Sequence, residues 1–82
     1  MTRVELRLFA AAGDVAGTKN ASFEAATVGD LLATAIERYG TSFASVLETA
    51  RVWVNGDEPV DGDATVLSEG DEVAVLPPVS GG

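Results

Sequence analysis

Apolar and polar residues alternate over residues 3–9, which predicts a half-buried strand at the start of the chain. Phe9 stands out because it is an aromatic residue on the otherwise polar face of this strand. Residues 10–17 are predicted to form a loop, with room for one helical turn before Gly17. A second, weaker strand is expected over residues 19–24, and a hairpin is the simplest connection between the two strands.

The clearest element is an amphipathic helix that begins at Thr27 and ends at Gly40. Thr27 and Asp30 resemble a capping box with Asp in place of the usual Glu or Gln, and Gly40 suits the position that follows a helix C-terminus. One apolar stripe runs along this helix, formed by Leu31, Leu32, Ala35, Ile36 and Tyr39. Residues 43–47 indicate a further short turn of helix over one end of the core.

The second half of the chain predicts two or three further strands. Residues 51–54 alternate, with Trp53 opposite two valines, and run into an Asn-Gly turn. Residues 65–67 can form only a short strand or a bridge. The final strand is predicted over residues 72–76, with Leu76 on the face opposite its valines.

This order of elements predicts an α+β roll, with a mixed sheet of four to five strands and one main helix on one face. Placing the last strand beside the first, in parallel, satisfies the right-handed crossover preference. The other face of the sheet then stays open, and alternation puts Phe9, Trp53 and Leu76 on it. We expect them to form a docking patch, with Val60 at its edge, because aromatic residues are enriched at interface cores. The alternative is that a loop buries one or more of them, or that they are scattered singly.

The 82 residues fit one domain and carry a net charge of −8, from 13 acidic and 5 basic residues. Such an acidic surface repels phosphate groups, so we expect no nucleic-acid partner and no membrane partner. The charge either steers the chain toward a basic docking face or only keeps it soluble. The sequence has no signal-peptide pattern and no apolar run of membrane-spanning length, which favours a cytoplasmic protein.

The chain contains neither cysteine nor histidine, which excludes thiol chemistry, disulfides and the commonest general base and transition-metal ligand. Asp61 with Asp63, and Asp71 with Glu72, form acidic pairs, but their flanking residues do not match a calcium loop. The glycines form no phosphate-binding pattern. We therefore expect solvated turns, no metal site, no stably bound cofactor and no catalysis by the chain alone.

Residues 77–82 read Pro-Pro-Val-Ser-Gly-Gly. The prolines fix φ at about −65° and lack an N–H, so they extend neither a sheet nor a helix. Gly81 and Gly82 have no Cβ, so their backbone can lie against the walls of a narrow cleft. Full extension from Pro78 reaches about 17 Å. We expect a domain over residues 1–76 and an extended tail that presents the carboxylate of Gly82. The alternative is an ordinary frayed terminus.

Residues 76–82, the Gly-Asp-Glu-Val of residues 70–73 and the Leu-Phe-Ala of residues 8–10 resemble the small subunit of molybdopterin synthase. The wider group is the ubiquitin-like sulfur carriers, which include the thiamine-pathway carrier. The resemblance covers the whole chain in length, element order and C-terminal ending. Leu76 departs from it, because many members have an aromatic residue there.

The resemblance implies a β-grasp fold, as in ubiquitin, and a carrier cycle. An ATP-dependent adenylyltransferase like the ubiquitin-activating enzymes would convert the Gly82 carboxylate to an acyl-adenylate, and a sulfur donor enzyme would then produce a thiocarboxylate. In the synthase, a large catalytic subunit would take the same tail, in a heterotetramer, and pass the sulfur to a pterin precursor. The partner-binding residues would be Phe9, Trp53, Val60, Leu76, Pro77, Pro78, Val79, Ser80 and Gly81.

Three other functions fit the same residues. The chain could carry sulfur for thiamine, cysteine or tRNA thiolation. It could be a protein modifier that is joined to lysines of its targets by an isopeptide bond. It could also be an interaction module whose tail is inert.

Overall fold

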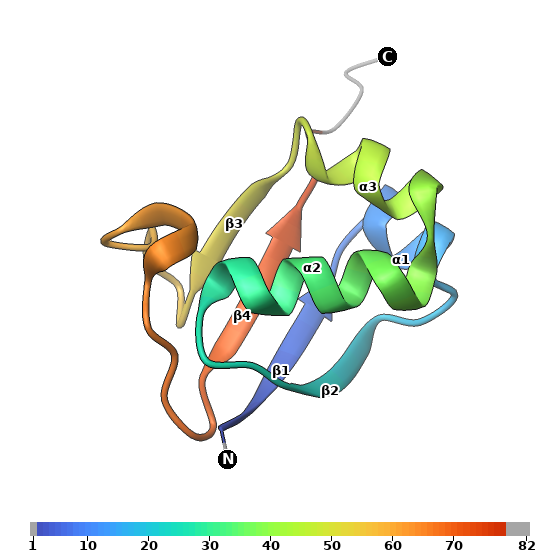
Figure 1. Cartoon of the computed structure of the whole chain (residues 1–82). Helices are drawn as coiled ribbons and strands as arrows, with labels where there is room; N and C mark the ends of the chain where they lie inside the picture. Colours follow the sequence, from blue (N-terminus) through green and yellow to red (C-terminus); the bar gives the residue numbers. More distant parts are fainter. Residues whose placement is uncertain (1, 79–82) are drawn as a thin grey trace.

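Four strands form one mixed sheet in the computed structural model, which describes residues 2–78 (Figure 1). The strands are β1 (Arg3–Leu8), β2 (Asn20–Glu24), β3 (Arg51–Val54) and β4 (Glu72–Leu76). Their order in the sheet is β2-β1-β4-β3. β1 and β4 are parallel, while β2 and β3 pair antiparallel with their neighbours. The predicted parallel pairing of the first and last strands is therefore confirmed.

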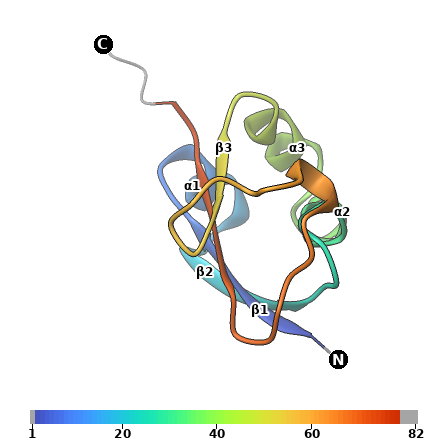
Figure 2. The ribbon, with the colours of Figure 1, turned by 90° about the vertical axis from the view of Figure 1, so that its left-hand side faces the viewer.

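Helices cover one face of this sheet. They are α1 (Ala11–Ala16), α2 (Val28–Tyr39) and α3 (Thr41–Leu47), and a 3-10 turn, η1, spans Gly62–Ala64. Figure 2 shows α2 and α3 on the same side of the strands. One long helix packed across a mixed sheet with parallel central strands is the β-grasp arrangement, so the predicted fold class is confirmed.

The core lies between α2 and the sheet. On β1 the alternation places Val4, Leu6 and Leu8 toward α2, and all three are buried. Val73 and Val75 do the same on β4. The remaining buried apolar residues are Ala12, Phe23, Ala25, Val28, Leu31, Ala35, Phe43 and Leu67. These buried residues form one cluster, and Val52 and Val54 of β3 pack against it.

The limits of α2 follow the predicted signals. The Thr27 hydroxyl oxygen accepts a hydrogen bond from the Asp30 N–H at 3.1 Å, as an N-cap residue does. At the other end the Gly40 N–H donates to the Ile36 carbonyl at 2.8 Å, and Gly40 has a φ of 93°. Gly40 therefore ends the helix in a conformation that an L-residue rarely adopts.

Residues 10–17 were predicted to form a loop with room for one helical turn before Gly17. The structure has a longer helix there, α1, which Gly17 closes, because the Gly17 N–H donates to the Gly13 carbonyl at 2.9 Å. Tertiary packing stabilises this helix, since Ala12 is fully buried in the core. A six-residue segment is too short to show helical periodicity, which explains the difference. Residues 65–67 form the bridge that was one of the two predicted forms, with Val66 opposite Thr27. No helix within residues 2–78 is long and apolar enough to cross a membrane.

Candidate functional site

The open face of the sheet carries a shallow apolar depression of about 310 Å³. It is lined by Phe9, Trp53, Gly56, Ala74 and Leu76. The three residues that the alternation assigned to this face are thus brought together, and Gly56 and Ala74 complete the surface. We call these five residues the apolar patch.

The strand register builds the apolar patch around β4. Trp53 lies opposite Ala74 in the ladder between β3 and β4. The Phe9 N–H donates to the Val75 carbonyl at 3.1 Å, which holds Phe9 against β4 on the other side. Ala74 is small, so the larger side chains of Trp53 and Leu76 stand around a hollow rather than a filled surface. Phe9 is 47% exposed, which leaves much of its ring available to a partner.

A tight turn after β3 holds Gly56 at the border of the apolar patch. Asn55 and Gly56 both have positive φ, 51° and 87°, as a hairpin turn of this type requires. The Asn55 side chain donates to the Asp71 carboxylate at 3.0 Å and accepts from the Glu72 N–H at 2.9 Å. A hydrogen bond from the Ser68 N–H and then the one from Asn55 lower the pKa of Asp71, because both favour its charged form.

Two ion pairs flank the apolar patch. Arg7 Nε lies 2.9 Å from Glu72 Oε1, and Arg51 Nη1 lies 4.0 Å from Glu58 Oε1. All four side chains are at least half exposed, so these pairs add little to stability. They do balance the charge around the patch, in a chain whose net charge is −8.

The tail begins beside the apolar patch, because Pro77 and Pro78 follow directly after Leu76 at the end of β4. Pro77 is partly buried and Pro78 is exposed. The predicted roles of residues 79–82, including that of Gly82, fall outside the described residues. Val60 is 86% exposed in the loop before η1 and does not line the patch, so its contact with a partner stays a prediction.

Sequence reasoning did not assign a role to Ala74 or Gly56. The signal for Ala74 was available, since it lies two residues before Leu76 on the same face of β4. The signal for Gly56 was weaker, because an Asn-Gly turn does not reveal which surface it borders. Within residues 2–78, no three acidic residues lie close enough together to hold a metal ion. The arrangement therefore offers an apolar contact surface at the base of the tail.

The chain matches the ThiS family over residues 6–82. It is 39% identical over 90 residues to small archaeal modifier protein 3 of Haloferax volcanii, with 96% of this chain and 98% of that protein covered. It is 35% identical over 83 residues to the molybdopterin synthase sulfur carrier subunit of Chlamydomonas reinhardtii, with 98% and 99% covered.

Two solved structures are similar over almost the whole chain. Small archaeal modifier protein 1 of Methanosarcina acetivorans has a TM-score of 0.87 and 28% identity, with 100% of this chain and 98% of that one covered. A complex of subunits 1 and 2 of the molybdopterin-converting factor of Helicobacter pylori has a TM-score of 0.69 and 28% identity, with 99% and 100% covered. With a family match that spans most of its length, a β-grasp fold and an apolar patch beside its C-terminal tail, this chain belongs to the ThiS family of ubiquitin-like sulfur carriers and modifiers.

Proposed function

We propose that this chain is a sulfur carrier that receives sulfur on the carboxyl group of Gly82 and delivers it for molybdopterin synthesis. The observation that carries the proposal is the position of the apolar patch, which borders the first residue of the tail. A partner that binds this patch is therefore next to Pro77, where the tail begins. The family match, which continues through Gly82, supports a role for the tail itself.

The chemistry requires activation because a carboxylate is a poor electrophile. An adenylyltransferase partner would let a Gly82 oxygen attack the α-phosphate of ATP, with release of pyrophosphate. The acyl-adenylate then has AMP as a leaving group, and sulfide from a donor enzyme displaces it to form the thiocarboxylate. The glycines of the tail suit this role, because they add no side chain where an active site must close around the reacting carbonyl.

The apolar patch would be the part that both partners recognise. The adenylyltransferase and the subunit that accepts the sulfur must each draw in the same tail, so each needs a contact at its base. Trp53 and Phe9 are aromatic anchors of the kind that dominate binding energy at interfaces. The flanking ion pairs of Arg7 and Arg51 would then lie at the polar rim of the contact.

The choice of molybdopterin synthesis rests on similarity. The relative from Chlamydomonas reinhardtii is a molybdopterin synthase sulfur carrier subunit, and the Helicobacter pylori structure is a complex of two subunits of the molybdopterin-converting factor. By analogy, this chain would be the small subunit of a synthase, with catalysis performed by a large subunit.

The activation step is tested with the adenylyltransferase from the same genome. Exchange of labelled pyrophosphate into ATP should depend on adding the chain. Two altered chains, one without Gly82 and one with an alanine added after Gly82, should give no exchange, while Ser80→Ala should retain it. Exchange that survives deletion of Gly82 would contradict the role of its carboxylate.

A second function, attachment to lysines of other proteins, is favoured by the 39% identity to small archaeal modifier protein 3. The test needs a protease suited to this sequence. The last basic residue is Arg51, so trypsin would leave residues 52–82 on the target lysine rather than two glycines. An endopeptidase that cleaves after glutamate would leave residues 73–82, because Glu72 is the last glutamate. Finding that remnant on lysines of cellular proteins would support the modifier function, and its absence from cells that make the chain would oppose it.

A further inference from the structure

The outer edge of β2 is unpaired within the described residues, because β2 has only β1 as a neighbour (Figure 1). Just beyond the strand, the Ala25 N–H donates to the Thr2 carbonyl at 3.0 Å. Antiparallel ladders alternate, so Phe23 also bonds toward β1, while the N–H and C=O groups of Ser22 and Glu24 point away from the sheet. Within residues 2–78 these outward groups have no hydrogen-bond partner. β2 therefore presents a free strand edge.

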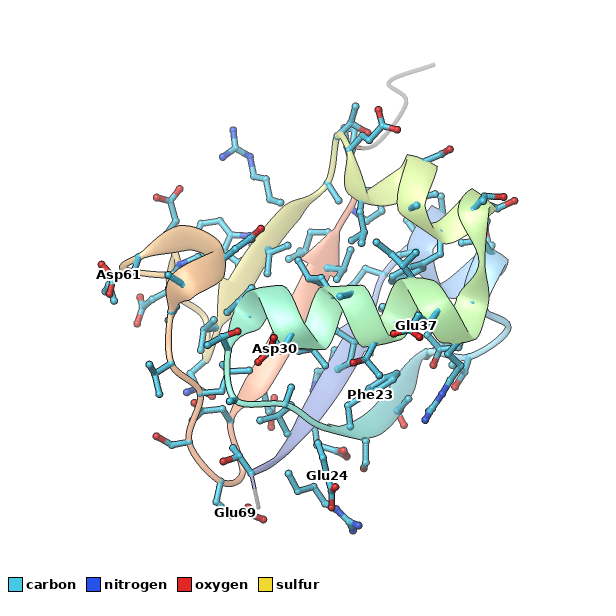
Figure 3. The ribbon with its side chains drawn as sticks, viewed as in Figure 1. Phe23, Glu24, Asp30, Glu37, Asp61 and Glu69 are labelled. Atoms are coloured by element: carbon cyan, nitrogen blue, oxygen red, sulfur yellow. The ribbon has the colours of Figure 1, made fainter. Side chains whose placement is uncertain are left out.

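A groove of about 340 Å³ runs along this edge, between β2 and α2. It is lined by Arg3, Ser22, Phe23, Glu24, Thr34 and Arg38. In Figure 3, Phe23 lies between α2 and β2, and Glu24 points away from the helix. An extended chain that paired with Ser22 and Glu24 would direct every second side chain toward this groove.

The two arginines that form no ion pair within residues 2–78 both line this groove. Arg7 and Arg51 form ion pairs on the open face of the sheet. Arg3 and Arg38 form none with any residue in the described part of the chain, and both line the groove. The Arg38 guanidinium lies over the Phe23 ring, 4.3 Å from its centroid, which fixes it at the wall.

We propose that this groove binds an extended acidic peptide of a partner protein, which adds to β2 as a fifth strand. Main-chain hydrogen bonds to Ser22 and Glu24 would supply affinity, and carboxylates beside Arg3 and Arg38 would supply selectivity. Charge complementarity selects this occupant, since the two unpaired arginines stand out in a chain of net charge −8. Glu24 lines the groove too, so the peptide's acidic residues would lie nearer the arginines.

The groove shares no residue with the apolar patch, and β1 separates β2 from β4. A bound peptide would therefore leave the base of the tail accessible, and the chain could hold two partners at once. The proposal goes beyond the carrier function and does not depend on it, because it concerns a different edge of the sheet.

The test uses the whole chain and a fluorescein-labelled peptide with a Val-Ile-Val centre followed by Asp-Glu-Asp. Binding is measured by fluorescence anisotropy, and the site is located by amide chemical shifts. We expect saturable binding with the largest shifts at Ser22 and Glu24. Arg3→Gln and Arg38→Gln should each weaken it about fivefold, and Glu24→Gln should strengthen it. Arg51→Gln removes the same charge at the opposite edge and should change binding by less than about twofold.

A backbone variant separates strand addition from simple charge attraction. Ser22→Pro removes an outward N–H without breaking a bond to β1, so the fold should persist while peptide binding is lost. Equal weakening by Arg51→Gln would overturn the proposal. So would shifts centred on Phe9 and Trp53, absence of saturable binding, or a dimer of the chain that occupies the β2 edge in place of the peptide.

Discussion

Truncation of Phe9 tests whether the apolar patch binds the partners. Phe9→Ala removes a ring that is 47% exposed in the free chain. Full burial of a phenylalanine side chain contributes about 3 kcal/mol, so about half of that, or about 1.5 kcal/mol, remains to be gained on docking. The variant should therefore bind the large subunit or the adenylyltransferase about tenfold more weakly.

Isothermal titration calorimetry with each partner measures this change, and the adenylation kinetics provide a second readout. Because Phe9 would contribute to binding the partner and not to the chemistry at the carboxyl group, KM for the chain should rise while kcat at saturation stays the same. Val66→Ala is the matched control, since Val66 is 75% exposed and lies outside the patch. The reasoning would be refuted if Phe9→Ala left the Kd unchanged, or if Val66→Ala weakened binding equally in a chain that circular dichroism shows to be folded.

Three further predictions concern the fold that positions the patch. Thr27→Ala removes the hydroxyl that caps α2 and should lower the free energy of unfolding by about 1 kcal/mol in urea titrations, whereas Thr27→Ser should retain most of it. Gly13→Ala places a Cβ 3.1 Å from the Leu8 carbonyl oxygen and should cost about 1–3 kcal/mol in the same assay; a neutral effect would mean that α1 can shift. The lowered pKa of Asp71 means that its carboxylate contributes stability above the pKa of the unfolded chain. That contribution should be lost as the pH falls below about 4. Asp71→Asn should therefore make the free energy of unfolding fall less steeply on the acid side of a pH–stability curve. An unchanged slope in the variant would contradict this prediction.

Much of this fold could be predicted because its signals are local. The alternation of apolar and polar residues predicted which residues of β1 and β4 face the core. The same alternation placed Phe9 and Leu76 on the open face of the sheet. Thr27 and Gly40 marked the limits of α2 through hydrogen bonds made within a single turn. Features of this kind depend only on neighbours in sequence, so the chain itself reveals them.

Other features depend on contacts that no local pattern encodes. α1 is held by the burial of Ala12 in the core, so its sequence alone predicted a loop with room for only one helical turn. The groove beside β2 joins Arg3 and Arg38, which lie far apart in the sequence and meet only when α2 packs on the sheet. Ala74 became part of the patch because β3 places Trp53 beside it.

The mass of the intact protein, isolated from the cells that make it, tests the central claim most directly. If Gly82 carries sulfur, a fraction of the chains should be heavier by about 16 Da, the difference between a sulfur and an oxygen atom. Fragmentation should place that increase at the C-terminal residue, and alkylation of the thiocarboxylate should label the same site. A chain that shows only its unmodified mass, in cells that are actively making molybdopterin, would contradict the account.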